Sequence, residues 1–401
     1  MFKARILHVL DMPLQASGVA THVLGLIKLQ REQGYDAQAM VLVDSHDVAP
    51  SEFAIAGFPK TFDLLQGWRM RQNLLEKLQH LNPDLIHLHA GFTTISPILV
   101  RTFTAFAPTV GTLHDVRPFC FHADRWQRPW ARSCIRLCGW GCFRAGCYTP
   151  ISLLDAAKKL RIIATGASAL LAWQALAQIL VPSKYMQELA LQHGFPPETL
   201  SLIPNWTETA SIQASISAKT AKPVIVYMGR LTPEKGVLTL LDALHQLRNQ
   251  SWQAIFIGDG LLREALTTKI TEYGLQDRVV ILTQTDSMER SLILSRALML
   301  VMPSLLPESF GLSGLEALAH GVPVVSFALG GITEWLHDQQ TGLVAQLTSS
   351  EELVKPIRRL LDDPALAAQL GKNGLELVRR DFSTTLAIQK LVKIYDRLIN
   401  S

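Results

Sequence analysis

Short runs of aliphatic and β-branched residues recur along the whole chain of 401 residues, separated by stretches long enough for helices. The runs are almost continuously apolar, which is typical of strands in a parallel sheet covered by helices on both faces. They comprise residues 5–10, 37–43, 84–90, 109–115, 178–183 and 200–205 in the first half, and 224–230, 253–260, 278–284, 298–304 and 322–328 in the second. The pattern predicts an α/β protein with two doubly wound, Rossmann-like sheets.

A stretch poor in large apolar residues separates the two sets of strands. Residues 207–222, TETASIQASISAKTAK, are rich in Ser, Thr and Ala, as solvated linkers are. We therefore expect an N-terminal domain over residues 1–206, a C-terminal domain over 223–383, and a final helix over 384–401 that packs across both. Ligands bind beyond the carboxyl ends of the strands in such sheets, so functional residues should lie in the loops that follow strands.

One long uncharged stretch, residues 162–183, has the length of a membrane span. Its Gly, Gln, Ser, Thr and Pro residues favour instead a buried helix that ends near Ala177, followed by a strand. The first apolar run of the chain stops at Asp11, too early for a secretory signal, and we interpret it as the first strand. A cytoplasmic protein is therefore expected.

Composition narrows the function further. Hydrophobic residues make up 48% of the chain and charged residues 18%, below the roughly 25% of a typical soluble protein, so a large core is expected. The formal net charge is +4, and no Lys/Arg run reaches the length of a nucleic-acid patch. Nucleic acid is therefore not expected as a partner.

Two carboxylates flank a short glycine-bearing segment in the second half. Glu308 precedes a helical pattern over residues 310–320, and Glu316 lies inside it, with Gly311 and Gly314 allowing a ligand to approach the backbone. The first turn of a helix offers unpaired N–H groups and a partial positive charge, which suit a phosphate. The arrangement fits a sugar nucleotide whose hydroxyls bind the two carboxylates.

A second interpretation of this pair is open on the residues alone. Glu308 can be a carboxylate stabilised by the helix dipole, and Glu316 a solvated helix residue.

Several further motifs accompany the carboxylates along nearly the whole chain, in the order SGVATHVLGL, DLIHLHAGF, GTLHD, LVPSKYMQEL, LIPNW, GRLTPEKG, IGDG, ESFGLSGLE, ALAHGVPVV and GGITEW. The set resembles the retaining glycosyltransferases of family 4, in which two glutamates form an E-x7-E signature. The resemblance implies the GT-B fold, in which two Rossmann-like domains face one another, and a nucleotide-sugar donor bound by the second domain.

Arg230 and Lys235 lie in the motif GRLTPEKG, after a strand and before a helix. A guanidinium and an ammonium together suit two phosphate groups. The chain has no Asp-x-Asp triplet to hold a divalent ion, so the resemblance implies a metal-independent enzyme in which this pair stabilises the departing diphosphate. A surface Arg and Lys beside a tight turn is the alternative.

The resemblance assigns the remaining site residues. It implies catalytic positions for Glu308, His114, Arg230 and Lys235. The expected donor-binding residues are Gly18, Arg230, Lys235, Ser309, Phe310, Gly311, Leu312 and Glu316. The family usually has two adjacent glycines where this chain has Ser17 and Gly18. For Gly18 a simple strand-to-helix turn, and for His114 a histidine satisfied within the core, are the competing interpretations.

All five cysteines fall between positions 120 and 147, namely Cys120, Cys134, Cys138, Cys142 and Cys147. Their spacing differs from that of common zinc sites, and both a zinc or iron–sulfur site and thiols with no joint role remain open. The surrounding insertion, about residues 117–148, mixes arginines with tryptophans. Such a segment suits peripheral contact with the inner face of a membrane, and packing within a soluble loop is the alternative.

The sequence therefore predicts a hexosyltransferase-type enzyme that moves a sugar from a nucleotide-diphosphate donor to a hydroxyl of a glycan or lipid-linked acceptor, as in polysaccharide biosynthesis. The resemblance to family 4 implies that the anomeric configuration is retained. A sugar-nucleotide epimerase and a non-catalytic nucleotide-sugar-binding protein are the alternatives on the same fold. A glycoside hydrolase is disfavoured because it gives no role to Arg230 and Lys235.

Overall fold

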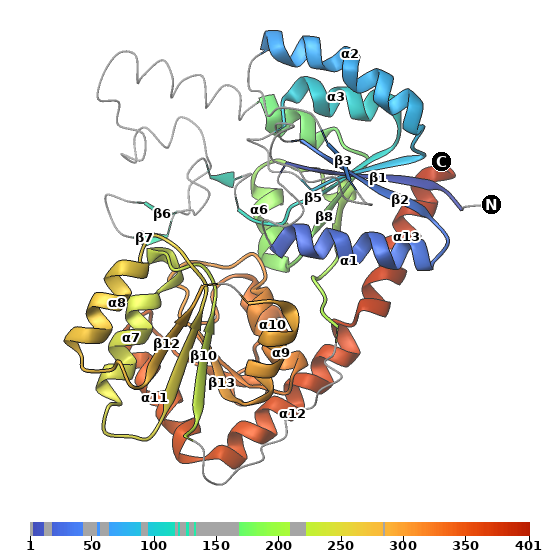
Figure 1. Cartoon of the computed structure of the whole chain (residues 1–401). Helices are drawn as coiled ribbons and strands as arrows, with labels where there is room; N and C mark the ends of the chain where they lie inside the picture. The colour runs from blue at the N-terminus through green and yellow to red at the C-terminus, as the bar shows by residue number, and fades with distance from the viewer. Residues whose placement is uncertain are drawn as a thin grey trace, which may run out of the picture. The chain divides into compact units, whose positions relative to one another are not determined.

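The computed structural model describes residues 3–11, 18–42, 54–56, 64–89, 95–116, 119–120, 126–127, 132–133, 168–208, 222–283 and 285–401. The chain forms two compact units, one of residues Met1–Ile203 with Ile388–Ser401 and the other of Pro204–Ala387 (Figure 1).

The first unit is built on a parallel sheet of seven strands in the order β3-β2-β1-β4-β5-β8-β9. The strands are β1 (Arg5–Leu10), β2 (Asp36–Val41), β3 (Ala54–Ala56), β4 (Leu85–Leu88), β5 (Thr109–Thr112), β8 (Gln178–Val181) and β9 (Leu200–Leu202). The helices are α1 (Gly18–Glu32), α2 (Leu64–Leu81), α3 (Pro97–Phe106) and α6 (Lys184–Gln192), and β6 (Trp126–Gln127) with β7 (Arg132–Ser133) forms a small antiparallel ladder. Strands β4 and β8 are buried at every position, as expected for strands covered on both faces.

The second unit has a parallel sheet of six strands in the order β12-β11-β10-β13-β14-β15. These are β10 (Val224–Met228), β11 (Gln253–Ile257), β12 (Val279–Leu282), β13 (Ala297–Met302), β14 (Val324–Ser326) and β15 (Gly342–Val344). The helices are α7 (Val237–Gln246), α8 (Arg263–Glu272), α9 (Ser287–Ser295), α10 (Leu312–Ala319), α11 (Ser350–Asp362) and α12 (Pro364–Asp381).

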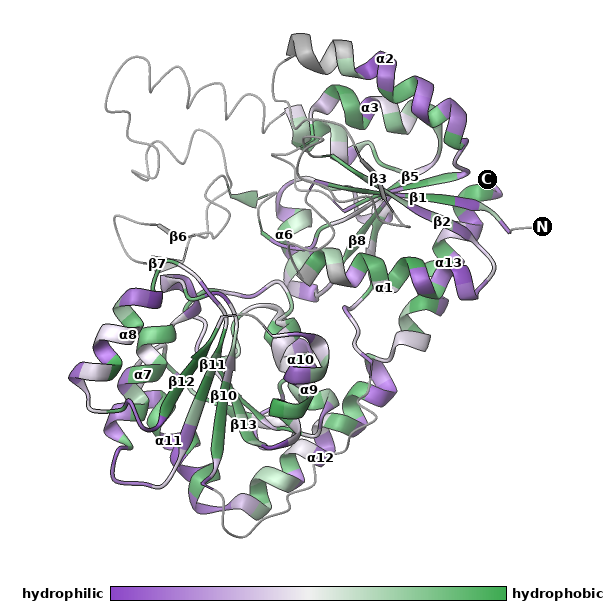
Figure 2. Cartoon of the chain, viewed as in Figure 1, coloured by the Kyte–Doolittle hydropathy of each residue, from purple (hydrophilic) through white to green (hydrophobic). Residues whose placement is uncertain are grey.

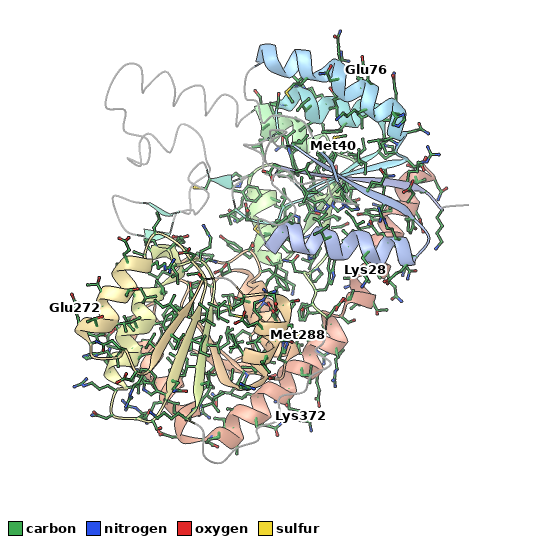
Figure 3. The ribbon with its side chains drawn as sticks, viewed as in Figure 1. Lys28, Met40, Glu76, Glu272, Met288 and Lys372 are labelled. Carbon is green, nitrogen blue, oxygen red and sulfur yellow. The ribbon has the colours of Figure 1, made fainter. Side chains whose placement is uncertain are left out.

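The alternation of side chains along β10 gives this unit its two cores. Ile225 and Tyr227 pack with α7 and α11 on one face of the sheet, whereas Val226 and Met228 pack with α10 and α12 on the other. In Figure 2 the strands carry the hydrophobic colour, while the outer helices alternate. Figure 3 places Met40 of β2 among the core side chains, where it is fully buried, while charged residues such as Lys28 and Glu76 project from exposed helix faces.

The C-terminal helix α13 (Thr384–Ile399) contains the second dividing line between the units, because the first unit includes the chain from Ile388 onward. Tyr35 donates a hydrogen bond to Asp396 at 2.6 Å, and Tyr395 is fully buried beside His87. Arg397 donates to the side-chain oxygen of Gln178. These contacts fix the end of the chain to the sheet of the first unit.

The predicted α/β class with two doubly wound parallel sheets is confirmed, and every strand expected from the sequence is present. Strands β3, β6, β7 and β15 were not anticipated; each has two or three residues, and β15 begins with Gly342. Residues 168–174 of the long uncharged stretch are helical and β8 follows them. Among the described residues, no helix combines the length and apolarity that a membrane span needs.

Candidate functional site

The site residues of the second unit lie at the carboxyl ends of β10 and β13. These strands are parallel neighbours, so the loops that leave them adjoin at one edge of the sheet. The backbone N–H of Leu305 donates to the carbonyl of Glu234 at 2.9 Å. Gly236 has φ +65°, and a Cβ there would lie 1.9 Å from the carbonyl oxygen of Pro303. Only glycine therefore permits this close approach of the two loops.

An ion pair joins the two loops. Nζ of Lys235 lies 2.5 Å from Oε1 of Glu308, and the hydroxyl of Ser304 donates to the same oxygen at 2.5 Å. Burial raises the pKa of Glu308, but the charge and hydrogen bond of Lys235, the Ser304 hydroxyl and the charge of Arg230 outweigh it, so the net shift is downward. Glu308 is therefore an ionised hydrogen-bond acceptor near neutral pH.

The main chain of Glu308 is held by Leu329 and by the motif GGITEW that follows it. Its N–H donates to the carbonyl of Leu329 at 3.1 Å, and its carbonyl accepts from the N–H of Gly331 at 2.7 Å. Gly330 has φ +68°, and a Cβ at that position would lie 2.5 Å from the carbonyl oxygen of Glu308. The two glycines thus allow a second loop to bind the backbone of Glu308 directly.

Helix α10 begins later than predicted, with Gly311 as its N-cap at φ +85° and no side-chain cap. Leu312 is its first residue, and Ser309 precedes the cap. Phe310 is fully buried, and its carbonyl accepts from the indole N–H of Trp335 at 2.7 Å. Phe310 therefore supports the start of the helix from within the core, and the N–H groups of the first helical turn are the groups left for a ligand.

Glu316 has a partner that the sequence did not reveal. Nε of Arg290, on helix α9, lies 3.3 Å from Oε1 of Glu316, and Nη1 of Arg290 donates to the carbonyl of Thr285 at 2.9 Å. The side chain of Arg290 is 30% exposed and that of Glu316 is 31% exposed. Glu316 is thus oriented, yet remains accessible to a ligand.

Arg230 is the most exposed of these charged groups, with 70% of its side chain accessible. Its guanidinium lies 3.2 Å from Glu234, and the hydroxyl of Tyr227 donates to its carbonyl at 2.6 Å. Arg230 and Lys235 therefore each face a carboxylate, and an incoming diphosphate would compete with these carboxylates for the two cations.

The motif IGDG supports this loop from the neighbouring strand. The N–H of Leu231 donates to the carbonyl of Asp259 at 2.8 Å, and Gly258, at φ +147°, would place a Cβ 1.9 Å from the carbonyl oxygen of Gly229. The glycines of the motif IGDG therefore allow this loop to pack closely against the loop that carries Arg230.

In the first unit, Gly18 opens helix α1, as the sequence predicted. His114 follows β5 and is half-buried, and its Nε2 lies 2.9 Å from Nδ1 of His89. His87 and His89 alternate on a strand in the motif LIHLH, and from the sequence we expect a structural or acceptor-proximal place for both and no chemistry.

Three buried histidines, His8, His87 and His89, each bring one ring nitrogen within 4.8 Å of the others. That spacing would suit a metal ion, but the nitrogens already have partners. Those of His87 face Tyr395 at 2.5 Å and Thr112 at 2.7 Å. The cluster is therefore complete as a hydrogen-bonded network of imidazoles.

Of the five cysteines, Cys120 is half-buried, and the other four lie outside the described residues, as does most of the insertion around them.

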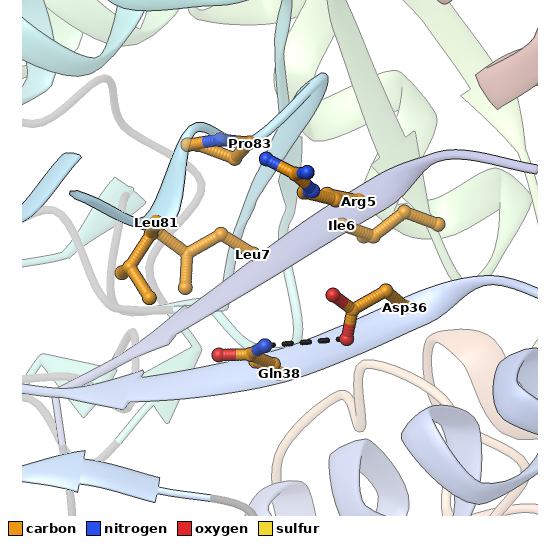
Figure 4. Close-up of a pocket in the computed structure, with 7 residues that line it drawn as sticks. All are labelled: Arg5, Ile6, Leu7, Asp36, Gln38, Leu81 and Pro83. Atoms are coloured by element: carbon orange, nitrogen blue, oxygen red, sulfur yellow. Dashed lines mark hydrogen bonds between the residues drawn. The ribbon is translucent and has the colours of Figure 1, made fainter. Parts of the chain in front are cut away.

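A shallow depression shown in Figure 4 lies at the amino ends of strands in the first sheet. Arg5 and Asp36, which line it, are the first residues of β1 and β2, and Gln38 donates to Asp36 at 3.2 Å. Ligands of open α/β sheets bind beyond the carboxyl ends of the strands, so this depression is not the expected site.

Two family models together match most of the chain. The model described as Glycosyltransferase Family 4 matches residues 16–211, and the model described as Glycosyl transferases group 1 matches residues 209–377. The chain belongs to glycosyltransferase family 4. The resemblance drawn from the sequence motifs is thus confirmed.

Curated relatives of this family 4 glycosyltransferase include two proteins of Streptomyces kanamyceticus. The chain is 32% identical to an alpha-D-kanosaminyltransferase over 179 residues, which are 43% of the chain and 45% of the relative. It is 24% identical to a 2-deoxystreptamine glucosyltransferase over 271 residues, 64% of the chain and 69% of the relative. The chain spans about half the length of most of the curated relatives it matches.

Solved structures show the GT-B fold across the chain. A glycosyltransferase from Rickettsia africae superposes with a TM-score of 0.74 at 15% identity and covers 99% of both chains. Anabaena HepE in complex with UDP gives a TM-score of 0.73 at 20% identity, covering 98% of this chain and all 100% of the other.

We expect Gly314→Ala to destabilise the second unit by about 1–3 kcal/mol, the usual cost of overpacking a core. The added Cβ would lie 2.1 Å from Cη2 of Trp335 and 2.6 Å from Sδ of Met302. Urea unfolding measures the free energy. Gly25→Ala, in helix α1 with nothing within 4 Å of the new Cβ, is the control and should not destabilise. Equal behaviour of the two variants would contradict tight packing of α10 on Trp335.

We also expect stability to fall as pH drops from 7.5 to 5. Burial lowers the pKa of His8 to about 4, so between pH 6.5 and 4 the unfolded chain binds a proton that the folded chain does not. The loss is about 2 kcal/mol at pH 5 for this one ring. His8→Gln should flatten the pH dependence of the free energy of unfolding, and His80→Gln, at an exposed histidine, should leave it unchanged. A slope that His8→Gln does not alter would refute the neutral buried ring.

Proposed function

We propose that the chain transfers a sugar from a nucleotide-diphosphate donor to a hydroxyl acceptor with retention of the anomeric configuration and without a metal ion. The observation that carries the proposal is the Lys235–Glu308 ion pair beside the amino end of helix α10. The pair places a cation suited to phosphate next to a carboxylate suited to sugar hydroxyls.

The proposed roles follow from charge and accessibility. Arg230 and Lys235, with the first-turn N–H groups of α10, would bind the diphosphate and stabilise its charge as it leaves. Glu316, which Arg290 orients, would accept hydrogen bonds from the ribose. On the sugar, Glu308 would accept hydrogen bonds from hydroxyl groups, and His114 of the first unit would help to position it.

The ionised state of Glu308 excludes this residue as the general acid of a glycoside hydrolase. A hydrolase needs one carboxylic acid whose raised pKa lets it protonate the leaving oxygen. The pKa of Glu308 is lowered, chiefly because Lys235 and Ser304 outweigh the effect of burial. A carboxylate in this state accepts hydrogen bonds and does not donate a proton.

Relatives suggest which ligands to try first. Anabaena HepE is described in complex with UDP and with UDP-glucose, and the curated relatives include a glucosyltransferase. We therefore propose a uridine or similar nucleotide with a hexose as donor, and a glycan or lipid-linked hydroxyl as acceptor. A cytoplasmic location with peripheral membrane contact through the arginine- and tryptophan-containing insertion is part of the same proposal.

Lys235→Ala should weaken binding of the matching nucleoside diphosphate by about ten- to a hundredfold, because a charge-assisted hydrogen bond contributes roughly 1.5–3 kcal/mol. Calorimetric titration against a panel of nucleoside diphosphates and nucleotide sugars, with and without EDTA, measures this. Lys269→Ala is the matched control, since Lys269 also forms a 2.6 Å ion pair, with Asp242, and is 28% exposed. Equal affinities of the two variants would exclude Lys235 from the diphosphate site, and affinity lost in EDTA would exclude metal independence.

Glu308→Gln should increase nucleoside diphosphate affinity by at least about threefold and should lower sugar transfer by at least about a hundredfold. Its charge competes for Lys235 in the free protein, and its oxygens bind the sugar in our proposal. Release of nucleoside diphosphate with a panel of hydroxyl acceptors, together with analysis of the product anomer, measures transfer. An altered sugar nucleotide formed without acceptor would indicate an epimerase, and donor binding with no turnover would indicate a binding protein.

A further inference from the structure

A line of hydrogen-bonded side chains runs through the first unit and ends at His114. Oε1 of Gln30 lies 2.7 Å from Nε2 of His8, Nδ1 of His8 lies 2.9 Å from Nε2 of His89, and Nδ1 of His89 lies 2.9 Å from Nε2 of His114. Gln30, His8 and His89 are buried, with at most 3% exposure. We name these four residues the histidine chain.

The fold brings the histidine chain together from four places in the sequence. Gln30 belongs to helix α1 and His8 to β1, while His89 and His114 follow β4 and β5. Strands β1, β4 and β5 are consecutive in the sheet, and the N–H of His89 donates to the carbonyl of Val9 at 2.8 Å. Neighbouring parallel strands therefore place the three rings in a row.

Proton counting restricts the state of the rings. A neutral imidazole has one N–H and one nitrogen with a lone pair, and each contact between two rings needs one of each. If Nε2 of His8 carries the hydrogen, its Nδ1 must accept from Nε2 of His89, whose Nδ1 must accept from Nε2 of His114. All three neutral rings must therefore share one tautomer.

Gln30 determines which of the two tautomers the three rings share. The oxygen of Gln30 can only accept, so His8 must donate from Nε2. Turning the amide round would present a donor and reverse every proton along the row. Whether the oxygen or the nitrogen of the Gln30 amide faces His8 therefore determines the tautomer of His114, the ring that follows β5.

We propose that Gln30, His8 and His89 are positioning residues that hold His114 as the Nε2–H tautomer, with the lone pair on its Nδ1. A ring in this state accepts a hydrogen bond through Nδ1, for example from a sugar hydroxyl. The link to a sugar rests on the proposed function; the tautomer itself does not.

The two buried rings, His8 and His89, stay neutral in their surroundings. Burial lowers the pKa of His8 to about 4, and burial together with the neighbouring histidines places the pKa of His89 well below its usual value. Among the described residues, the titratable groups that face the row are other histidines and a tyrosine: His87 lies 3.9 Å from His89 between ring centroids, His22 lies 5.9 Å from His114, and Tyr395 contacts His87. Burial disfavours a first proton on this cluster, and a second proton would also be repelled by the charge of the first.

Nuclear magnetic resonance of the full chain, labelled with 15N-histidine and free of ligand, tests the proposal at pH 7.5. Long-range 1H–15N correlations distinguish the two tautomers and the charged ring, and single His→Gln variants assign the signals. We expect Nε2–H patterns for His8, His89 and His114. An Nδ1–H pattern or an imidazolium at His114 would overturn the proposal, and so would Zn2+ binding by His8 and His89 in the protein as purified.

Two variants at one position test the role of Gln30. Gln30→Met removes the acceptor and should release His114 into a mixture of tautomers, whereas Gln30→Glu keeps an acceptor and should preserve Nε2–H. His80, exposed on α2, should not change in either variant. An unchanged His114 pattern in Gln30→Met would contradict the proposal. If Gln30→Met does not fold, the wild-type and Gln30→Glu spectra still decide it.

A kinetic comparison separates this inference from the proposed function. With an active donor and acceptor, Gln30→Met should lower kcat by at least about tenfold through the lost lone pair, while nucleoside diphosphate affinity in the second unit stays unchanged and Gln30→Glu restores part of kcat. Wild-type protein without transferase activity would refute the proposed function and leave the NMR result standing. Full kcat in Gln30→Met with a scrambled tautomer would refute positioning by the histidine chain.

Discussion

The arrangement of the candidate site in the second unit depends on the ion pair between Lys235 and Glu308. This pair joins groups 73 residues apart in sequence, at the exits of two neighbouring parallel strands. A half-buried pair of this kind is strong only if its remaining hydrogen-bonding positions are satisfied, and Ser304 supplies a further donor to Glu308. The pair therefore holds two loops together and keeps a carboxylate ionised at the edge where ligands of such sheets bind.

Glycines make this arrangement sterically feasible. Gly236 and Gly330 adopt positive φ angles, and at both positions a Cβ would collide with a carbonyl oxygen of the opposing loop. Three loops can thus pack backbone against backbone around Glu308. The helix that follows is fixed in turn by Trp335, whose indole bonds the carbonyl of Phe310 and lies against Gly314. The Lys235–Glu308 ion pair and the close packing at these glycines therefore hold the same loops in place around Glu308.

Much of the fold could be predicted from the sequence because buried parallel strands are nearly continuous apolar runs, and the motif order indicated the family. The sequence placed Glu308 before a helix, Glu316 inside it and Gly18 at the start of another helix, as the structure has them, and their roles in binding stay predictions. The partners of the carboxylates could not be predicted: Arg290 carries no motif, and a contact between Lys235 and Glu308 depends on strand order. The start of α10 was placed too early because the left-handed conformation of Gly311, which ends the preceding loop, has no local signal beyond glycine itself. The histidine chain could not be predicted either, because its members come from separate strands and one helix and meet only through the order of the strands.

The most direct test of the central claim is a double-mutant cycle between Lys235→Ala and Glu308→Gln, read out as affinity for the nucleoside diphosphate that the wild type binds. If the two side chains form the pair that a diphosphate must enter, Glu308→Gln will alter affinity when Lys235 is present and have little effect when it is absent, with a coupling energy above about 0.5 kcal/mol. Additive effects of the two substitutions would contradict the account.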